Sequence, residues 1–197
     1  MNEFINKNII IVGPSLNQPK NDFLQKYDIV IRTNNFINSD LYNLRCDALL
    51  LNYITARVID VKSLYKIYKS NIKYIICYHD YYLKFKKYLP NKKIIIINIK
   101  NKTNRINYIY KKHPTIIYIL IMNLLDYNIR SLFIDGIDFY TNKKIYIDGY
   151  KWSIHNKKES IHNINEDKSF LILLLHNIKN INTTLYIFNI LKKFLSK

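Results

Sequence analysis

The sequence is poor in the two residues that most often break or loosen a chain. It has only 3 glycines and 4 prolines in 197 residues, so Gly-rich or Pro-rich linkers between domains are not expected. Hydrophobic residues make up 49% of the chain and charged residues 23%, which excludes intrinsic disorder. A chain of this length fits one domain with a sizeable core. We therefore expect a single domain over residues 1–197.

Cysteine is also scarce, and its placement argues against zinc. Cys46 and Cys77 each lie in or beside an apolar run, where reduced core thiols are the ordinary interpretation. A helix would place His155, Glu159 and His162 on one face, but the Glu-x-x-His half-motif has no second copy and differs from His-Glu-x-x-His. We expect neither a metal site nor a cofactor.

Acidic residues are outnumbered by basic ones, 14 to 31, which leaves a formal net charge of +17. The basic residues are spread along the chain in pairs such as Lys86-Lys87 and Lys192-Lys193, with no basic arm and no nucleic-acid motif. Ile, Asn, Lys and Tyr are all in excess, as expected from AT-rich codons. We do not expect nucleic acid as a partner; a diffuse positive field favours an anionic membrane or acidic glycans.

Long hydrophobic runs are missing as well. The longest, Thr115 to Leu125, is too short to span a bilayer. The first residues, MNEFINKN, contain an acidic residue and no apolar core of the kind found in secretory leaders. We expect a cytoplasmic protein, with peripheral association to the inner face of the membrane left open.

Short continuous runs of Ile, Val, Leu and Phe alternate with stretches of helical length. Continuous apolar runs are typical of parallel strands that are covered on both faces. The expected helices are Asp60–Lys69, whose apolar residues lie on one face, and two stretches that are apolar nearly all round and so should be buried, Thr115–Tyr127 and Asp167–Ile178. The expected strands are Ile9–Val12, Ile29–Ile31, Ala48–Leu51, Tyr74–Cys77, Ile94–Ile97, Leu132–Ile134 and Leu185–Phe188.

This alternation predicts the fold class α/β: a Rossmann-like domain with a mostly parallel sheet and helices on both faces. Ligands of such sheets bind beyond the carboxyl ends of the strands. The residues that follow four of the expected strands are therefore candidates for binding. They are Gly13-Pro14-Ser15, Arg32-Thr33-Asn34-Asn35, Asn52, and Asp135-Gly136-Ile137-Asp138-Phe139-Tyr140.

Each of these candidates has an ordinary structural explanation. Gly13 could allow backbone N–H groups to approach a phosphate, but any strand can end in a Gly-Pro turn. The segment has neither the three glycines of the dinucleotide fingerprint nor the Gly-Lys-Ser/Thr of a Walker loop. Asn34 follows a strand, and an Asn in that position often only caps a helix.

Two tyrosines and one histidine have the chemistry of catalytic groups. Tyr140 and Tyr146 are six residues apart and could donate hydrogen bonds to a leaving phosphate, although the chain holds 18 tyrosines and most must pack or lie at the surface. His162 is expected in a loop before the Asp167 helix, with Asn165, Glu166 and Asp167 near that helix start. A histidine there could act as a general base near neutral pH.

Taken in order, these segments resemble the bacterial sialyltransferases of glycosyltransferase family 42. Gly13-Pro14-Ser15-Leu16 is similar to the first turn of that family, residues 28–34 to its Asp-Val-x-Arg-x-Asn segment with one residue more, and Asn52 to the Asn that ends its next strand. Gly136-Ile137-Asp138-Phe139-Tyr140 matches the family's segment in every letter, and Tyr146 matches its second tyrosine. His162-Asn-Ile-Asn165-Glu-Asp167 is similar to the segment that carries the catalytic base.

The resemblance implies a metal-independent transfer of sialic acid from CMP-sialic acid to a glycan hydroxyl, with inversion, on a GT-A-like variant of the fold. It implies that His162 is the base and that Tyr140 and Tyr146 assist the leaving phosphate. The partners would be the CMP-sugar donor and a glycan or glycolipid acceptor, as in lipooligosaccharide or capsule synthesis. A short lid is expected at about 141–161. The implied substrate-binding residues are Gly13, Pro14, Ser15, Asn34, Asn52, Gly136 and Asp138.

Several alternatives stay open. Val12 stands where the family carries an Asn. The family's donor-binding Ser falls near Ile116, and its Arg just upstream falls near His113. The donor could thus be another CMP-sugar such as CMP-Kdo, or the chain could be an inactive relative. A non-catalytic basic module that binds nucleotides or polyanions is the third alternative. The acceptor, the linkage and any homo-oligomer are not determined by the sequence.

Overall fold

The computed structural model describes residues 2–15, 18–39, 43–97, 115–137 and 164–183. They form a seven-stranded sheet in which every pair of neighbouring strands is parallel, in the order β5-β4-β3-β2-β1-β6-β7. This confirms the α/β, Rossmann-like class. The strands are β1 Asn8–Val12, β2 Ile29–Thr33, β3 Ala48–Leu50, β4 Tyr74–Tyr78, β5 Lys93–Ile97, β6 Ser131–Asp135 and β7 Ile181–Thr183.

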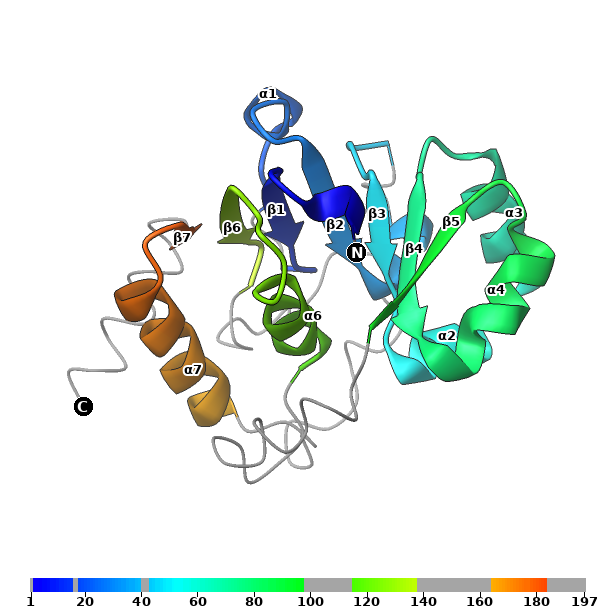
Figure 1. Ribbon diagram of the computed structural model, residues 1–197. Helices are drawn as coiled ribbons and strands as arrows, with labels where there is room; N and C mark the ends of the chain where they lie inside the picture. The colour runs from blue at the N-terminus through cyan, green and yellow to red at the C-terminus, as the bar shows by residue number, and fades with distance from the viewer. Residues whose placement is uncertain (1, 16–17, 40–42, 98–114, 138–163, 184–197) are drawn as a thin grey trace.

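Helices cover both faces of this sheet (Figure 1). The α-helices are α1 Asn21–Leu24, α2 Tyr53–Val58, α3 Val61–Lys69, α4 Tyr82–Tyr88, α6 Ile116–Leu124 and α7 Ile164–Asn177. Three short 3-10 helices complete the described elements: η1 Asn2–Phe4, η2 Asn34–Asn38 and η3 His79–Tyr81.

Successive residues of a strand enter opposite layers of the core. Ile9 and Ile11 belong to a cluster with α6 and α7, whereas Ile10 and Val12 pack with Leu24 of α1. All four side chains are at most 1% exposed. Because a strand points alternate side chains to opposite faces, a run without polar residues is what a sheet covered on both sides requires.

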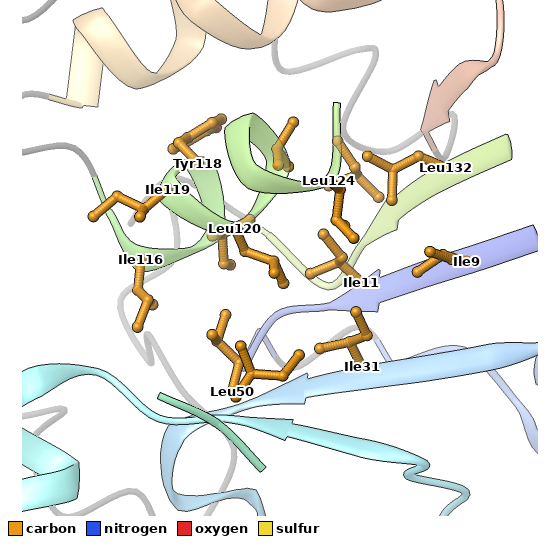
Figure 2. Packing of buried hydrophobic residues seen from close by; sticks show 14 of the residues in the cluster. Ile9, Ile11, Ile31, Leu50, Ile116, Tyr118, Ile119, Leu120, Leu124 and Leu132 are labelled. Atoms are coloured by element: carbon orange, nitrogen blue, oxygen red, sulfur yellow. The ribbon is translucent and has the colours of Figure 1, made fainter. Parts of the chain in front are cut away.

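Helix α6 is the central helix on one face of the sheet. Figure 2 shows Leu120 facing the side chains of β1, β2 and β3, among them Ile11, Ile31 and Leu50. Eight of its nine side chains are buried, all but Met122. The prediction of a buried helix in this stretch is confirmed.

Helix α7 is only half covered, which corrects the prediction that it is buried all round. Asp167, Phe170, Leu171 and Leu174 are buried at helical spacing, whereas Leu173 is 51% exposed. The helix lies on one side of the sheet at its β7 end, so one stripe meets the core, for example through the edge-on contact of Phe170 with Tyr118 at 5.4 Å between ring centroids. It begins at Ile164, three residues before the predicted start.

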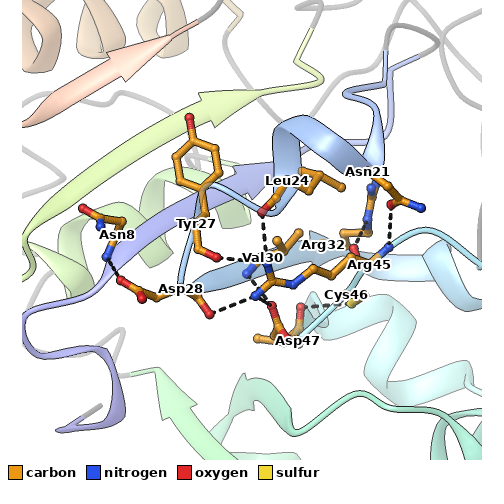
Figure 3. A network of polar contacts seen from close by, with 11 residues as sticks. Asn8, Asn21, Leu24, Tyr27, Asp28, Val30, Arg32, Arg45, Cys46 and Asp47 are labelled. Carbon is orange, nitrogen blue, oxygen red and sulfur yellow. Dashed lines mark hydrogen bonds and ion pairs between the residues drawn. The ribbon is translucent and has the colours of Figure 1, made fainter.

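A polar network ties together the amino ends of β2 and β3 (Figure 3). Arg45 Nη1 donates to the carbonyl oxygens of Leu24 at 3.0 Å and Tyr27 at 2.9 Å, and its Nη2 forms an ion pair with Asp47 at 2.8 Å. Asp47 in turn accepts from the Val30 N–H at 2.9 Å. The network anchors the segment after α1 and lies at the edge opposite the expected ligand site, so we regard it as structural.

Six of the seven predicted strands match β1 to β6 within two residues at each end. The seventh prediction, Leu185–Phe188, lies outside the described residues, and the edge strand β7 comes just before it. No helix within the described ranges is long and apolar enough to cross a membrane. The single-domain boundaries and the lid at 141–161 stay predictions, the latter outside the described residues.

Candidate functional site

The strand order places the candidate site between β1 and β6. From β1 the chain adds β2 to β5 on one side of the sheet and then returns to add β6 and β7 on the other side. Such a reversal leaves a crevice at the carboxyl ends of the two central strands, where doubly wound folds bind their ligands. Gly13 follows β1 and Gly136 follows β6, so two of the predicted residues lie at this switch point.

The two glycines pack backbone against backbone. Gly13 N donates to the Asp135 carbonyl at 2.8 Å, and Ser15 N donates to the Gly136 carbonyl at 2.9 Å. A Cβ on Gly13 would lie 2.5 Å from the Gly136 oxygen, and one on Gly136 would lie 2.7 Å from the Gly13 oxygen. Gly136 also has a φ of +65°, which favours glycine.

This packing changes the interpretation of the first turn. The N–H groups of Gly13 and Ser15 are already bonded to the end of β6, and Pro14 has no N–H, so the turn does not offer these amides to a phosphate. Ser15 is buried at 2% exposed, whereas Pro14 is half-buried. The missing side chain of Gly13 therefore serves first to let β1 and β6 end close together.

Hydrogen bonds from Gln18, which is itself bound by the buried Arg32, hold the same turn in place. Gln18 Nε2 donates to the carbonyls of Gly13 at 3.0 Å and Ser15 at 2.6 Å, and its Oε1 accepts from Arg32 Nη1 at 2.7 Å. Arg32 is 1% exposed, and its guanidinium lies 4.5 Å from the ring centroid of Phe36. A buried charge of this kind requires such partners.

These groups line a small hollow beside the switch point. The space between its atoms is about 150 Å³ including open solvent, and no part of it is wide enough to enclose a water molecule. The lining residues are Val12, Gly13, Pro14, Gln18, Arg32, Thr33 and Phe36. The hollow thus lies between the carboxyl ends of β1 and β2, and the charged side chain of Arg32 lines it.

The two predicted asparagines meet directly. Asn34, with a φ of +52°, accepts a hydrogen bond from the Asn52 backbone N–H through its Oδ1 at 3.0 Å. Asn52 Oδ1 accepts from the Thr55 N–H at 2.7 Å and so caps α2. Both side chains are half-buried, and neither Nδ2 group donates a hydrogen bond within the part of the chain that the structure describes. The Nδ2 groups of Asn34 and Asn52 could therefore donate hydrogen bonds to a ligand at the carboxyl ends of β2 and β3.

A group of tyrosines continues the same edge of the sheet, and the sequence interpretation missed it. Tyr53 directly follows Asn52. Its ring centroid lies 5.1 Å from that of Tyr81 and 6.3 Å from that of Tyr78. Burial raises the pKa of Tyr81 to about 12, with a further contribution from its hydrogen bond with Tyr53. The sequence does contain a signal for these tyrosines. Ligands bind beyond the carboxyl ends of parallel strands, and Tyr78 and Tyr81 follow the predicted strand Tyr74–Cys77.

The predicted catalytic residues cannot be placed in this geometry. Tyr140, Tyr146 and His162, together with Asp138, lie outside the described residues. The helix that should follow His162 is present, since α7 begins at Ile164 and carries Glu166 and Asp167 in its first turn. Acidic residues there are favourable because a helix N-terminus is partly positive. Among the described residues no group of three His, Cys, Asp or Glu side chains could hold a metal ion.

Comparison with known proteins gives a fold relative but no family assignment. No family model matches the sequence, and no curated protein matches it. Solved structures of the sialyltransferase CstII from Campylobacter jejuni do match. The complex with cytidine-5'-monophosphate shares 18% identity over 90% of this chain and 80% of that one, with a TM-score of 0.58.

Two further CstII structures give similar values. The complex with CMP-3FNeuAc has 17% identity, 90% and 78% coverage and a TM-score of 0.54. Monomeric CstII has 17% identity, 90% and 80% coverage and a TM-score of 0.57. At this level of identity the comparison concerns the fold: the chain has the α/β fold of these sialyltransferase structures.

Proposed function

We propose that this protein is a glycosyltransferase that transfers sialic acid from CMP-sialic acid to a hydroxyl of a glycan or glycolipid. The observation that carries the proposal is that Gly13, Gly136, Asn34 and Asn52 lie at the carboxyl ends of four adjacent strands, at the switch point between β1 and β6 and beside it at β2 and β3. The CstII structures that share this fold contain CMP and a CMP-sugar analogue. The ordered sequence segments point to the same donor.

The proposed donor site combines spacing and hydrogen-bond donors. The Nδ2 groups of Asn34 and Asn52 are suited to a phosphate or carbonyl oxygen of the donor. The tight Gly13–Gly136 contact keeps the strand ends free of side chains that would block its approach. Pro14, Ser15 and Asp138 are assigned to the same site on the sequence match.

The proposed reaction is a single displacement. The acceptor oxygen attacks the anomeric carbon, its new bond forms while the bond to the CMP phosphate breaks, and the configuration is inverted. His162 takes the hydroxyl proton, and the electron pair leaves with CMP, where Tyr140 and Tyr146 donate hydrogen bonds to the growing charge. These three roles rest on the order of the sequence segments, as does the expectation that no metal is required.

The first experiment is to measure CMP release from CMP-sialic acid in EDTA. We compare the native protein with His162→Ala and with His176→Ala, which removes an exposed histidine of α7. Release should persist in EDTA, fall at least about a hundredfold in His162→Ala, the usual scale for a lost general base, and stay unchanged in the control. Release that needs a divalent metal would overturn the metal-free mechanism.

The other outcomes separate the remaining alternatives. Tight CMP binding without release, followed by turnover of CMP-Kdo, would mean a different donor, and no turnover of any CMP-sugar would mean an inactive relative. Steeply salt-dependent binding to any polyanion, unaffected by His162→Ala, would mean a binding module instead of an enzyme.

A further inference from the structure

The outer surface of α3 and α4 is unusual in charge. The two helices, residues 61–69 and 82–88, contain six lysines and no acidic residue. Lys62, Lys69, Lys86 and Lys87 form no ion pair within the described ranges, whereas Lys84 is bound to the carbonyls of Ala56 and Arg57. The nearest acidic residue before α3, Asp60, is used as its cap through the Ser63 N–H.

Tyrosines accompany these lysines on the same surface. Tyr65 is 62% exposed and Tyr88 is 51% exposed. Lys69 Nζ lies 5.7 Å from the ring of Tyr65 and 5.8 Å from that of Tyr68, and Lys87 Nζ lies 5.5 Å from that of Tyr88. Lysines in the last turn of a helix stabilise its dipole, which explains Lys66 and Lys69 of α3 and Lys86 and Lys87 of α4 but not the exposed rings.

The two helices present one continuous surface. Asn91, just after α4, donates to the Tyr68 carbonyl at 3.0 Å, and Lys92 Nζ donates to the Ser70 carbonyl at 2.7 Å. These contacts place the C-terminal ends of α3 and α4 side by side, as Figure 1 also shows at the β5 end of the sheet. Aliphatic side chains extend the surface, with Val61 and Leu83 more than three-quarters exposed.

We propose that this α3–α4 surface docks on an anionic lipid bilayer. Lysine heads meet lipid phosphates, since each basic residue near an anionic surface adds attraction. Tyrosine rings and lysine stems lie at the boundary between head groups and acyl chains, where their apolar bodies and polar tips are both satisfied. Exposed Val61 and Leu83 favour a bilayer over nucleic acid, which offers no apolar phase to cover them.

Docking in this orientation has a consequence for the candidate site. Helix α2 begins with Tyr53 at the ligand edge and leads into α3 through only Ile59 and Asp60. The docking surface therefore starts beside the candidate site. A lipid-linked acceptor would reach that site along the membrane, but docking itself does not depend on the proposed reaction.

The test uses the full chain and vesicles of phosphatidylcholine, with and without 30% phosphatidylglycerol. Cosedimentation should show binding to the anionic vesicles at 100 mM salt that weakens at 500 mM. The variant Lys62→Gln/Lys69→Gln/Lys86→Gln/Lys87→Gln should lose at least about tenfold in affinity, as several surface lysines together predict. Tyr65→Ser/Tyr68→Ser should weaken binding at both salt concentrations.

The matched control removes the same charge elsewhere. Lys7, Lys20, Lys26 and Lys73 are exposed outside the two helices, and their replacement by Gln should leave vesicle affinity within about threefold of the native value, since screened charges act only over a Debye length. Equal loss in both quadruple variants would overturn the proposal in favour of diffuse charge. Stronger binding of single-stranded DNA than of vesicles, or a dimer that only the α3–α4 variant dissociates, would also overturn it. CMP affinity in solution should be unchanged, which separates this test from that of the enzyme.

Discussion

At the scale of single residues, the two glycines at the switch point carry the tightest constraint. Gly13 and Gly136 approach each other so closely that a methyl group on either would meet a backbone oxygen, which cannot rotate away. The strand ends must therefore separate if either glycine is replaced. A change in this contact would move both sides of the candidate site at once.

We predict that Gly13→Ala lowers the free energy of unfolding by about 1–3 kcal/mol, the usual range for overpacking, and also weakens CMP binding. Lys73→Ala is the control, because Lys73 is exposed just before β4, at the edge of the sheet opposite the candidate site. Urea denaturation and calorimetric titration with CMP measure the two effects. Native stability and CMP affinity in Gly13→Ala would show that the turn tolerates the clash and that our account of it is wrong.

At the scale of elements, Asn52 has two functions that can be separated. Its Oδ1 caps α2 through the Thr55 N–H, while its Nδ2 is the proposed donor to the ligand. Aspartate keeps the acceptor and loses the amide donor; alanine loses both. The cap is worth about 1 kcal/mol in such positions.

We predict that Asn52→Asp keeps native stability but loses CMP affinity, whereas Asn52→Ala loses both. Asp60→Ala provides the control: it removes the cap of α3 at the Ser63 N–H and should cost about 1 kcal/mol of stability without changing CMP binding. Thermal unfolding and CMP titration of the three variants are the measurements. If Asn52→Asp binds CMP normally, the amide has no role in binding.

Element boundaries show where sequence patterns suffice. Helix α3 was predicted over Asp60–Lys69, and it ends at Lys69 as expected. Of the three apolar residues predicted to share its buried face, Leu64 and Ile67 are buried, but Val61 is 79% exposed. Helix α7 was not predicted correctly in burial, because its Leu and Ile residues surround the helix while only one stripe meets the core. The hydrophobic pattern shows which side chains of a helix could be buried. The position of the helix at the edge of the sheet decides which of them are buried.

At the scale of the whole molecule, both thiols are held in the neutral form. Burial raises the pKa of Cys46 and of Cys77 to about 12, from an ordinary value of 9. Cys46 is only half-buried as a residue, but its Sγ donates to the Ala48 carbonyl at 3.3 Å and is turned into the protein. Burial raises the pKa of the Tyr78 phenol to about 12 in the same way.

We predict that stability falls as the pH rises from about 9 to 12. In this window the unfolded thiols and phenols release protons that the folded protein retains, so their contribution is complete below pH 9 and is lost toward pH 12. Lys84 and Lys92, whose pKa burial lowers, act in the opposite direction. Urea denaturation followed by circular dichroism at pH 8 to 11 measures the slope.

The variant Cys46→Ala/Cys77→Ala isolates the thiol contribution. Its stability should vary less with pH between 9 and 10 than that of the native protein, since only the phenols and lysines remain. Thiol reagents at pH 8 should label the native protein slowly and the unfolded protein at once. An unchanged slope in the double variant would show that the two thiols ionise normally in the fold.

The sequence by itself determined the strands, the parallel sheet and the strand ends at which ligands should bind. It did so because continuous apolar runs of strand length have few other ways to be buried, and because the carboxyl ends of parallel strands share one edge. Only the tertiary structure decided which residues meet there. The bond from Asn52 to Asn34, the Gln18–Arg32 support of the first turn and the contact of Tyr53 with Tyr81 join segments 14 to 28 residues apart. No local pattern encodes such pairs, because they depend on strand order and on how far each turn projects from the sheet.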